Sequence, residues 1–255
     1  MDKTRLKEAF KNYVSAYDLS DPKIELKVVH TYKVATFAEE IGRSIPDLRE
    51  EEVDFCWLLG LLHDIGRFEQ LKRYGTFLDA ESVDHAELGA DILFKEGVLP
   101  QFWTKGITGM PDEEEKTLIE LAIRQHNKLA LQEGLSEKEA FYCNVLRDAD
   151  KVDIFRVAQE VPFEVRMTSK RNDVPRPARE EIMECIRQHR CVPRYPNRTE
   201  FESHLSGCAM AFELVFEKSK ELAKEQGFLG QMLSYEPADS RQKKQMEEVR
   251  KELDL

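Results

Sequence analysis

The sequence predicts an all-α protein. Almost every long segment repeats its apolar residues with the period of an α-helix, and no segment alternates apolar and polar residues as a strand would. Capping-box patterns at residues 136–139 and 199–202 mark two helix starts. We expect one helical domain over residues 1–160, and a basic loop segment with C-terminal helices over residues 161–255 that pack on the same domain.

The N-terminal half contains four predicted helices. Residues 2–18 form a charged, amphipathic helix, and the second helix (22–44) starts with an aspartate cap followed by proline. Residues 50–65 are an apolar helical run. A polar loop with scattered aromatic residues is expected over 68–84, before a short helix over 85–96.

The C-terminal half begins with a second loop over 97–111. Four acidic residues then occupy the first turn of a helix that starts at residue 112, which suits the helix dipole. The two capping boxes start helices over 136 to about 160 and 199 to about 224. Residues 239–255 form either a charged helix or a frayed tail.

Composition limits the possible functions. The net charge of −11 argues against a general nucleic-acid binder. No apolar run is long enough to cross a membrane, and the N-terminus has no apolar signal core. Five cysteines without paired spacing fit a reducing compartment. We therefore expect a cytoplasmic protein that acts away from membranes, and the sequence does not predict its oligomeric state.

Several polar residues fall on the apolar faces of predicted helices. They are His30, His63, Asp64, His85, His126 and Asp150. The adjacent His63 and Asp64 alone are explained equally well by a local ion pair. Histidines on four different helices would each need a buried partner, however, and a shared cation provides one for all of them. Imidazoles and carboxylates suit one or two divalent ions of Mn, Fe, Co, Ni or Zn better than Mg or Ca.

The order of these residues resembles the HD-domain superfamily of metal-dependent phosphohydrolases. The resemblance covers roughly residues 25–160. His30, the pair His63-Asp64, and Asp150 match the family's basic set for one metal ion. The resemblance implies an HD-domain helical bundle, here with a Pro/Arg-rich insertion and C-terminal helices.

Two further histidines match a subgroup of that family. His85 and His126 look like the extra ligands of the members that bind two metals, in which Asp64 would bridge the ions. Asn127 follows His126 where the cyclic-dinucleotide phosphodiesterases carry another histidine, so their substrate is not expected here.

The resemblance implies hydrolysis of a phosphoester in a nucleotide or another small, anionic phosphorylated molecule by metal-activated hydroxide. Asp64 and Arg67 are the expected catalytic residues. Arg67 follows the motif by one turn, and a guanidinium pairs well with phosphate; its alternative role is to neutralise a helix C-terminus. Lys128 and Lys151 are weaker substrate-binding candidates, for which the alternative is a solvated lysine.

The segment 162–198 is rich in proline and arginine within an acidic protein. It is either a cover that attracts an anionic substrate to the metal site, or a surface segment whose arginines pair with acidic helices.

Two other functions are compatible with the same ligands. The pattern also resembles the mixed-valence di-iron HD oxygenases, such as the inositol oxygenases. A non-catalytic regulatory module that retains its metal is the third alternative.

Overall fold

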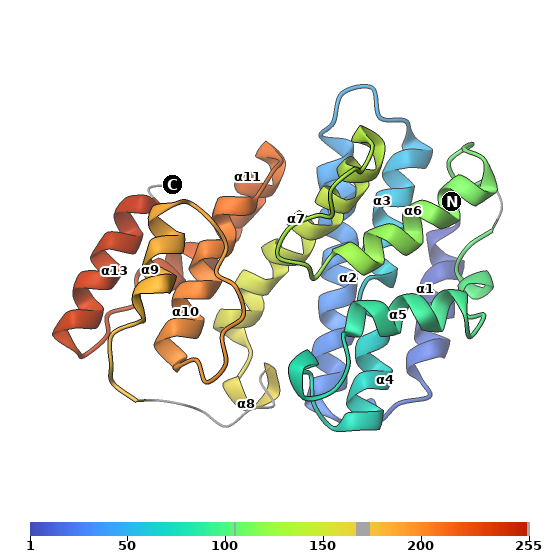
Figure 1. Cartoon of the computed structure of the whole chain (residues 1–255). Helices are drawn as coiled ribbons and strands as arrows, with labels where there is room; N and C mark the ends of the chain where they lie inside the picture. Colours follow the sequence, from blue (N-terminus) through green and yellow to red (C-terminus); the bar gives the residue numbers. More distant parts are fainter. Residues whose placement is uncertain (105, 167–173, 254–255) are drawn as a thin grey trace. The chain divides into compact units, whose positions relative to one another are not determined.

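The computed structural model describes residues 1–104, 106–166 and 174–253. Within these ranges the chain forms α-helices and short 3-10 helices and no strand, so the all-α prediction is confirmed (Figure 1). Its contacts divide it into two compact units: residues 1–150 with a short stretch from 164, and residues 151–163 with the C-terminal part of the chain. That the residues after 160 pack on the domain formed by 1–160 stays a prediction.

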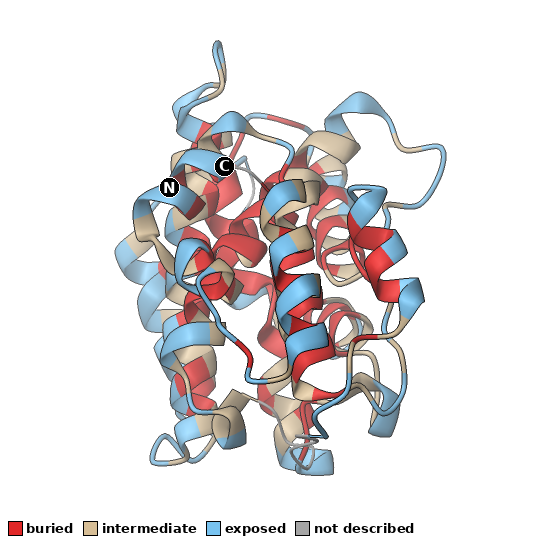
Figure 2. Ribbon diagram, turned by 90° about the vertical axis from the view of Figure 1, so that its left-hand side faces the viewer, coloured by how far each residue is buried: buried red, intermediate tan, exposed pale blue. Residues whose placement is uncertain are grey.

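The first unit contains the helices that carry the predicted site. They are α1 (Lys3–Val14), α2 (Pro22–Arg43), α3 (Glu50–Leu62), α4 (Ile65–Tyr74), α5 (His85–Phe94), α6 (Asp112–Gln125) and the first part of α7 (Glu137–Glu160), with the 3-10 helices η1 (Asp79–Glu81) and η2 (Leu99–Gln101). The predicted start of α2 is confirmed, because Asp21 accepts a hydrogen bond from the backbone of Lys23 just after Pro22. Figure 2 shows buried and exposed residues alternating along single helices, as expected for amphipathic helices.

The pair α2 and α3 forms the centre of this unit. From Phe55 to Leu62 every residue of α3 is buried. A Cβ placed on Gly60 would lie 2.5 Å from Cα of Ala35, so only glycine allows the two helices to approach this closely. The helices are joined by residues 44–49 and run antiparallel, and this contact brings the C-terminal end of α3 beside the first half of α2.

The predicted loop over 68–84 is wrong in its first half, because α4 continues to Tyr74. Gly66 lies inside α4, where it allows close packing against α5: a Cβ there would lie 2.3 Å from the carbonyl oxygen of His85. Phe68 on α4 is completely buried. The helix ends instead at Gly75, whose φ of 67° is the left-handed conformation common at helix C-termini.

The second unit contains the C-terminal helices. They are the end of α7, then α9 (Glu180–Arg187), α10 (Glu200–Ala209), the 3-10 helix η3 (Met210–Glu213), α11 (Glu217–Gln226), α12 (Phe228–Leu233) and α13 (Ser240–Glu252); α8 (Phe163–Arg166) lies at the boundary between the units. The helix predicted over 199–224 is interrupted, because the chain becomes extended at the buried Leu214 before α11 begins. Residues 239–255 were predicted as helix or tail, and α13 is helical. Among the described residues, no helix is both long and apolar enough to cross a membrane.

Candidate metal centre

Two histidines meet where α2 and α3 pack together. The Nε2 atoms of His30 and His63 lie 3.3 Å apart, and both side chains are buried. His63 stands at the C-terminal end of α3, where its Nδ1 lies 2.8 Å from the carbonyl oxygen of Gly60. Asp150 on α7 completes this group, with Oδ1 at 3.0 Å from His30 Nε2 and 3.8 Å from His63 Nε2.

A second histidine pair comes from α5 and α6. The Nε2 atoms of His85 and His126 lie 3.1 Å apart. His126 Nδ1 lies 2.7 Å from the carbonyl oxygen of Ile123, and His85 Nδ1 lies 2.9 Å from both carboxylate oxygens of Asp79. Because these partners only accept hydrogen bonds, each Nδ1 carries the proton and each Nε2 of a neutral ring presents a lone pair.

The electrostatics keep these rings neutral. Burial lowers the pKa of His63 to about 4, against the opposing effect of Asp64. Burial, followed by the positive charge of Arg67, lowers the pKa of His85 to about 3, and burial also lowers the pKa of His126. The lone pairs of His85 and His126 therefore face each other without a proton between them. A cation between them would convert this repulsion into two bonds.

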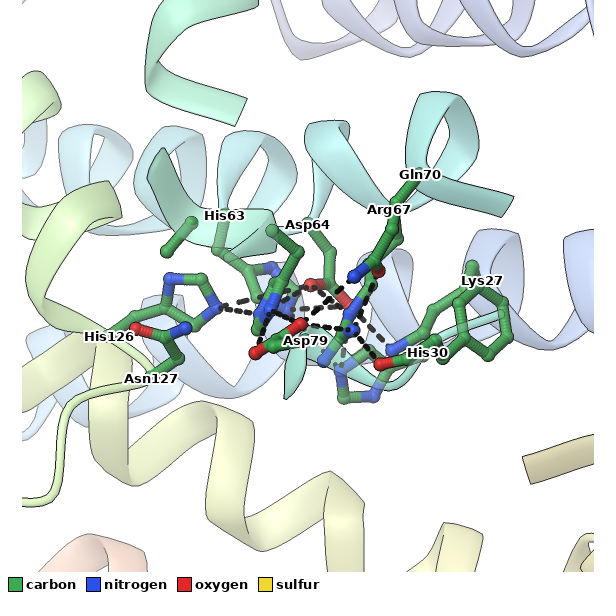
Figure 3. Close-up of polar contacts among 12 residues, drawn as sticks. Lys27, His30, His63, Asp64, Arg67, Gln70, Asp79, His126 and Asn127 are labelled. Carbon is green, nitrogen blue, oxygen red and sulfur yellow. Dashed lines mark hydrogen bonds and ion pairs between the residues drawn. The ribbon is translucent and has the colours of Figure 1, made fainter. Parts of the chain in front are cut away.

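Asp64 lies between His126 and His30 (Figure 3), and its two oxygens contact different histidine pairs. Its Oδ2 is 3.6 Å from Nε2 of both His30 and His63, and its Oδ1 is 3.6 Å from His85 Nε2 and 3.9 Å from His126 Nε2. Burial favours the protonated carboxyl, but Lys27 and the surrounding histidines and arginine hold the pKa of Asp64 well below its ordinary value. Each carboxylate oxygen therefore faces one histidine pair as an anion.

The six side chains fit a metal ion. Five of them form two buried groups of possible ligands that share Asp64, one with His30 and His63 and the other with His85 and His126. The sixth, Asp150, lies 3.0 Å from His30. Nitrogen and carboxylate oxygen donors without thiolate suit divalent first-row transition metals. The facing lone pairs of the second group also need a cation, so the cluster is compatible with a divalent metal site.

Three polar residues that surround the cluster were not predicted. Lys27 donates a hydrogen bond of 2.7 Å to Asp64 Oδ2. Asp79, the first residue of η1, contacts His85, and it also accepts hydrogen bonds from Gln70 and Arg67. Lys27 lies three residues before His30 on α2 and so shares its helix face, a signal available in the sequence. Asp79 and Gln70 have no such signal, because a loop conformation brings them together.

Arg67 is close to the cluster and already has several partners. Its Nη1 donates to the backbone oxygen of Phe77 at 2.6 Å and to Asp79 Oδ1 at 3.1 Å, and its Nε lies 3.6 Å from Asp64 Oδ1. The guanidinium therefore lies beside the carboxylate that separates the histidine pairs. Figure 3 shows it on the same side of Asp64 as Gln70.

The two lysines expected to bind substrate have other partners. Lys128 Nζ is 2.7 Å from Asp84 Oδ2 and 3.2 Å from Glu87. Lys151 belongs to the second unit, where its Nζ is 3.4 Å from Glu213. Their substrate-binding role stays a prediction.

Comparison with known protein families identifies the part of the chain that contains the cluster. The family model described as the HD domain matches residues 28–154, a range that includes all six cluster residues. Comparisons with curated proteins and with solved structures found no significant match. The helical fold, the buried cluster and the matching model agree, and the chain therefore belongs to the HD-domain family through residues 28–154.

Proposed function

We propose that this protein is a metal-dependent phosphohydrolase. The observation that carries the proposal is the position of Asp64, with one carboxylate oxygen toward each histidine pair. A carboxylate shared by two sets of imidazoles would allow this cluster to hold two neighbouring cations. The proposed ligands are His30, His63, Asp64 and Asp150 for one ion, and Asp64, His85 and His126 for the other.

Divalent ions at this site would acidify a water molecule and offset the negative charge on a phosphoryl group, the two demands of phosphoester hydrolysis. The protein's own residues position the reactants. We assign Asp64 and Arg67 to catalysis. Arg67 is held by Asp79 and by the backbone of Phe77, and in the proposal it binds a phosphoryl oxygen as a rigid donor. Lys128 and Lys151 are the further proposed contacts for the substrate.

The proposed substrate is a nucleotide or another small phosphorylated molecule, and the proposed location is the cytoplasm. The five cysteines are buried and form no disulfide with one another, which suits a reducing compartment. The HD family supports the class of substrate, because its members are generally metal-dependent phosphohydrolases.

The basic segment 162–198 is not needed for this proposal. Lys170, Arg171 and part of its loop lie outside the described residues. In the described part, Arg179 pairs with Glu202 at 2.9 Å, and Arg187 pairs with Glu248 at 2.5 Å and with Glu180. These pairs favour the surface-segment alternative for the arginines that make them.

The test is phosphate release from a panel of nucleotides and small phosphoesters by metal-stripped protein resupplied with Mn, Fe, Co, Ni or Zn. Asp64→Asn keeps the side-chain shape and removes the charge, so we expect it to abolish turnover. Asp54→Asn is the control, because Asp54 lies on α3 and pairs with Lys3 away from the cluster. Metal-loaded protein that releases no phosphate but consumes oxygen with iron would contradict the proposal and favour the oxygenase.

A further inference from the structure

Lys27 and one histidine pair lie next to the same oxygen atom of Asp64. Its Nζ donates to Asp64 Oδ2 at 2.7 Å, and the same oxygen faces Nε2 of His30 and of His63 at 3.6 Å. Among the described residues, Asp64 is the only carboxylate within ion-pair distance of Lys27 Nζ. The ammonium therefore neutralises the carboxylate that a bound metal would also neutralise.

The surroundings of Lys27 make a surplus positive charge costly. Its side chain is only 15% exposed, and its Nζ lies 5.4 Å from the ring centre of Phe77. Arg67 lies over the same ring at 5.7 Å, with its Nε near the other oxygen of Asp64. Once Asp64 is bonded to a cation, Arg67 keeps its pair with Asp79, whereas Lys27 has to share Asp64 with that cation. Buried charges need partners, so the loaded site is complete only when an anion joins it.

We propose that Lys27 binds the substrate, by donating a hydrogen bond to an oxygen of a terminal phosphate group. The proposal rests on the proposed function and narrows its substrate class to phosphomonoesters. A terminal phosphate presents three acceptor oxygens, which can meet the metal centre, Lys27 and Arg67 together. An internal phosphodiester has only two free oxygens and one negative charge, so one oxygen would have to serve two of these partners.

The chemistry of lysine suits this role. An ammonium has three donors on a flexible stem, so Lys27 keeps its contact with Asp64 while another donor reaches the phosphate. The Lys27 side chain is largely but not completely buried, with 15% of its surface exposed. Arg67, by contrast, is fixed by the backbone oxygen of Phe77 and by Asp79. Lys27 thus supplies an adaptable charge and Arg67 a rigid one.

The experiment measures two binding reactions by calorimetry. Mn²⁺ is titrated into metal-stripped protein, and inorganic phosphate is then titrated into the Mn²⁺-loaded protein. Lys27→Met retains an unbranched apolar stem that can pack on Phe77 and removes the charge. Lys33→Met is the matched control, because Lys33 is exposed on the same helix. Lys27→Arg tests whether a positive charge alone is sufficient.

We expect Lys27→Met to weaken phosphate binding at least tenfold while Mn²⁺ binds equally or more tightly, since a competing cation has been removed. Lys33→Met should match the wild type in both titrations, and Lys27→Arg should recover part of the phosphate affinity. Unchanged phosphate affinity in Lys27→Met would overturn the proposal and leave Lys27 as a neutralising partner of Asp64. Loss of Mn²⁺ binding in that variant would also overturn it, because Lys27 would then support the ligands.

The result separates this inference from the proposed reaction. If the wild type binds phosphate through Lys27 but hydrolyses no phosphoester in the panel, the anion site stands and the phosphohydrolase proposal fails. If the wild type hydrolyses phosphoesters and Lys27→Met has normal phosphate affinity, the reaction stands and the role of Lys27 is refuted. A wild-type protein that is loaded with Mn²⁺ and binds no phosphate refutes the role of Lys27 as well.

Discussion

His85 and His126 direct their Nε2 atoms toward each other across 3.1 Å, while each ring uses its Nδ1 for a contact with an acceptor. This relationship is unfavourable for two neutral imidazoles by themselves and favourable around a cation. It depends on the partners of the two Nδ1 atoms, because they determine which nitrogen of each ring has the lone pair.

Asp79 is the partner that holds His85 in this state. Asp79→Asn should weaken divalent metal binding about 10- to 100-fold, as is typical when a carboxylate behind a metal-binding histidine is lost. Gln70 and Arg67 both donate to Asp79 Oδ1, so the amide oxygen of asparagine would keep that position and its N–H₂ group would face His85 Nδ1 in place of Oδ2. Metal titration of stripped protein measures the effect. Asp54→Asn, at the pair with Lys3 away from the cluster, is the control; equal affinities for the two variants would contradict the role of Asp79.

Gly66 allows α4 and α5 to pack closely. A Cβ at this position would lie 2.3 Å from the carbonyl oxygen of His85 and 2.6 Å from the backbone nitrogen of Gly89. Gly66→Ala should therefore lower the free energy of unfolding by about 1–3 kcal/mol, as overpacking does. It should also weaken metal binding, since the helix start that carries His85 must shift.

Urea denaturation measures the stability change. Gly230→Ala is the matched control, because the space around Gly230 in α12 is open and alanine favours the helix. If Gly66→Ala and Gly230→Ala have the same free energy of unfolding, α4 and α5 can move apart to accept the extra methyl group without loss of stability, and the packing role of Gly66 is contradicted.

Asp84 should make the stability depend on pH. It caps α5 by accepting from the backbone of Ala86 and Glu87, and it pairs with Lys128. Although burial opposes ionisation, these partners and Asn127 lower the pKa of Asp84 to about 2. Because this value lies below that of an aspartate in the unfolded chain, about 3.9, the contribution is complete above about pH 4 and is lost as the pH falls toward 2.

The corresponding measurement is urea denaturation of Asp84→Ala and Asp84→Asn at several pH values. Asp84→Ala should cost about 1 kcal/mol at pH 7, the usual effect of losing a cap, and less near pH 2. Asp84→Asn retains a capping oxygen and should cost less at pH 7. A cost for Asp84→Ala that stays constant with pH would show that the charge of Asp84 does not contribute.

Glu115 anchors the loop before α6. Its buried carboxylate accepts hydrogen bonds from Trp103 Nε1 at 2.9 Å, from the backbone of Thr108 at 2.6 Å and from the Thr108 hydroxyl. Glu115→Gln would replace one acceptor by an N–H₂ group that faces a donor. We expect a loss of about 1–3 kcal/mol in unfolding free energy and a changed Trp103 fluorescence. Glu113→Gln, at an exposed position, should alter stability by less than about 0.5 kcal/mol; a similar effect of both variants would contradict this account.

The sequence was sufficient for the helical class and for the members of the cluster. Helical periods placed His30, His63 and Asp150 on inward faces, and those positions depend only on local geometry. The same local rules failed after residue 65, because they predicted a loop from residue 68 where the chain forms α4, with Gly66 packed against α5. They also failed at Leu214. The sequence predicted one continuous helix over 199–224, but the backbone at Leu214 is extended and interrupts it.

The tertiary structure alone decided how the cluster is arranged. The distance between His30 and His63 depends on the contact between Gly60 and Ala35, which no local pattern specifies. The division of the histidines into two pairs, one on each side of Asp64, and the contacts of Asp64 with Lys27 and of His85 with Asp79 likewise require atoms from separate helices and loops. Periodicity determines which side of a helix a residue occupies, whereas packing between helices determines which residues on those sides meet.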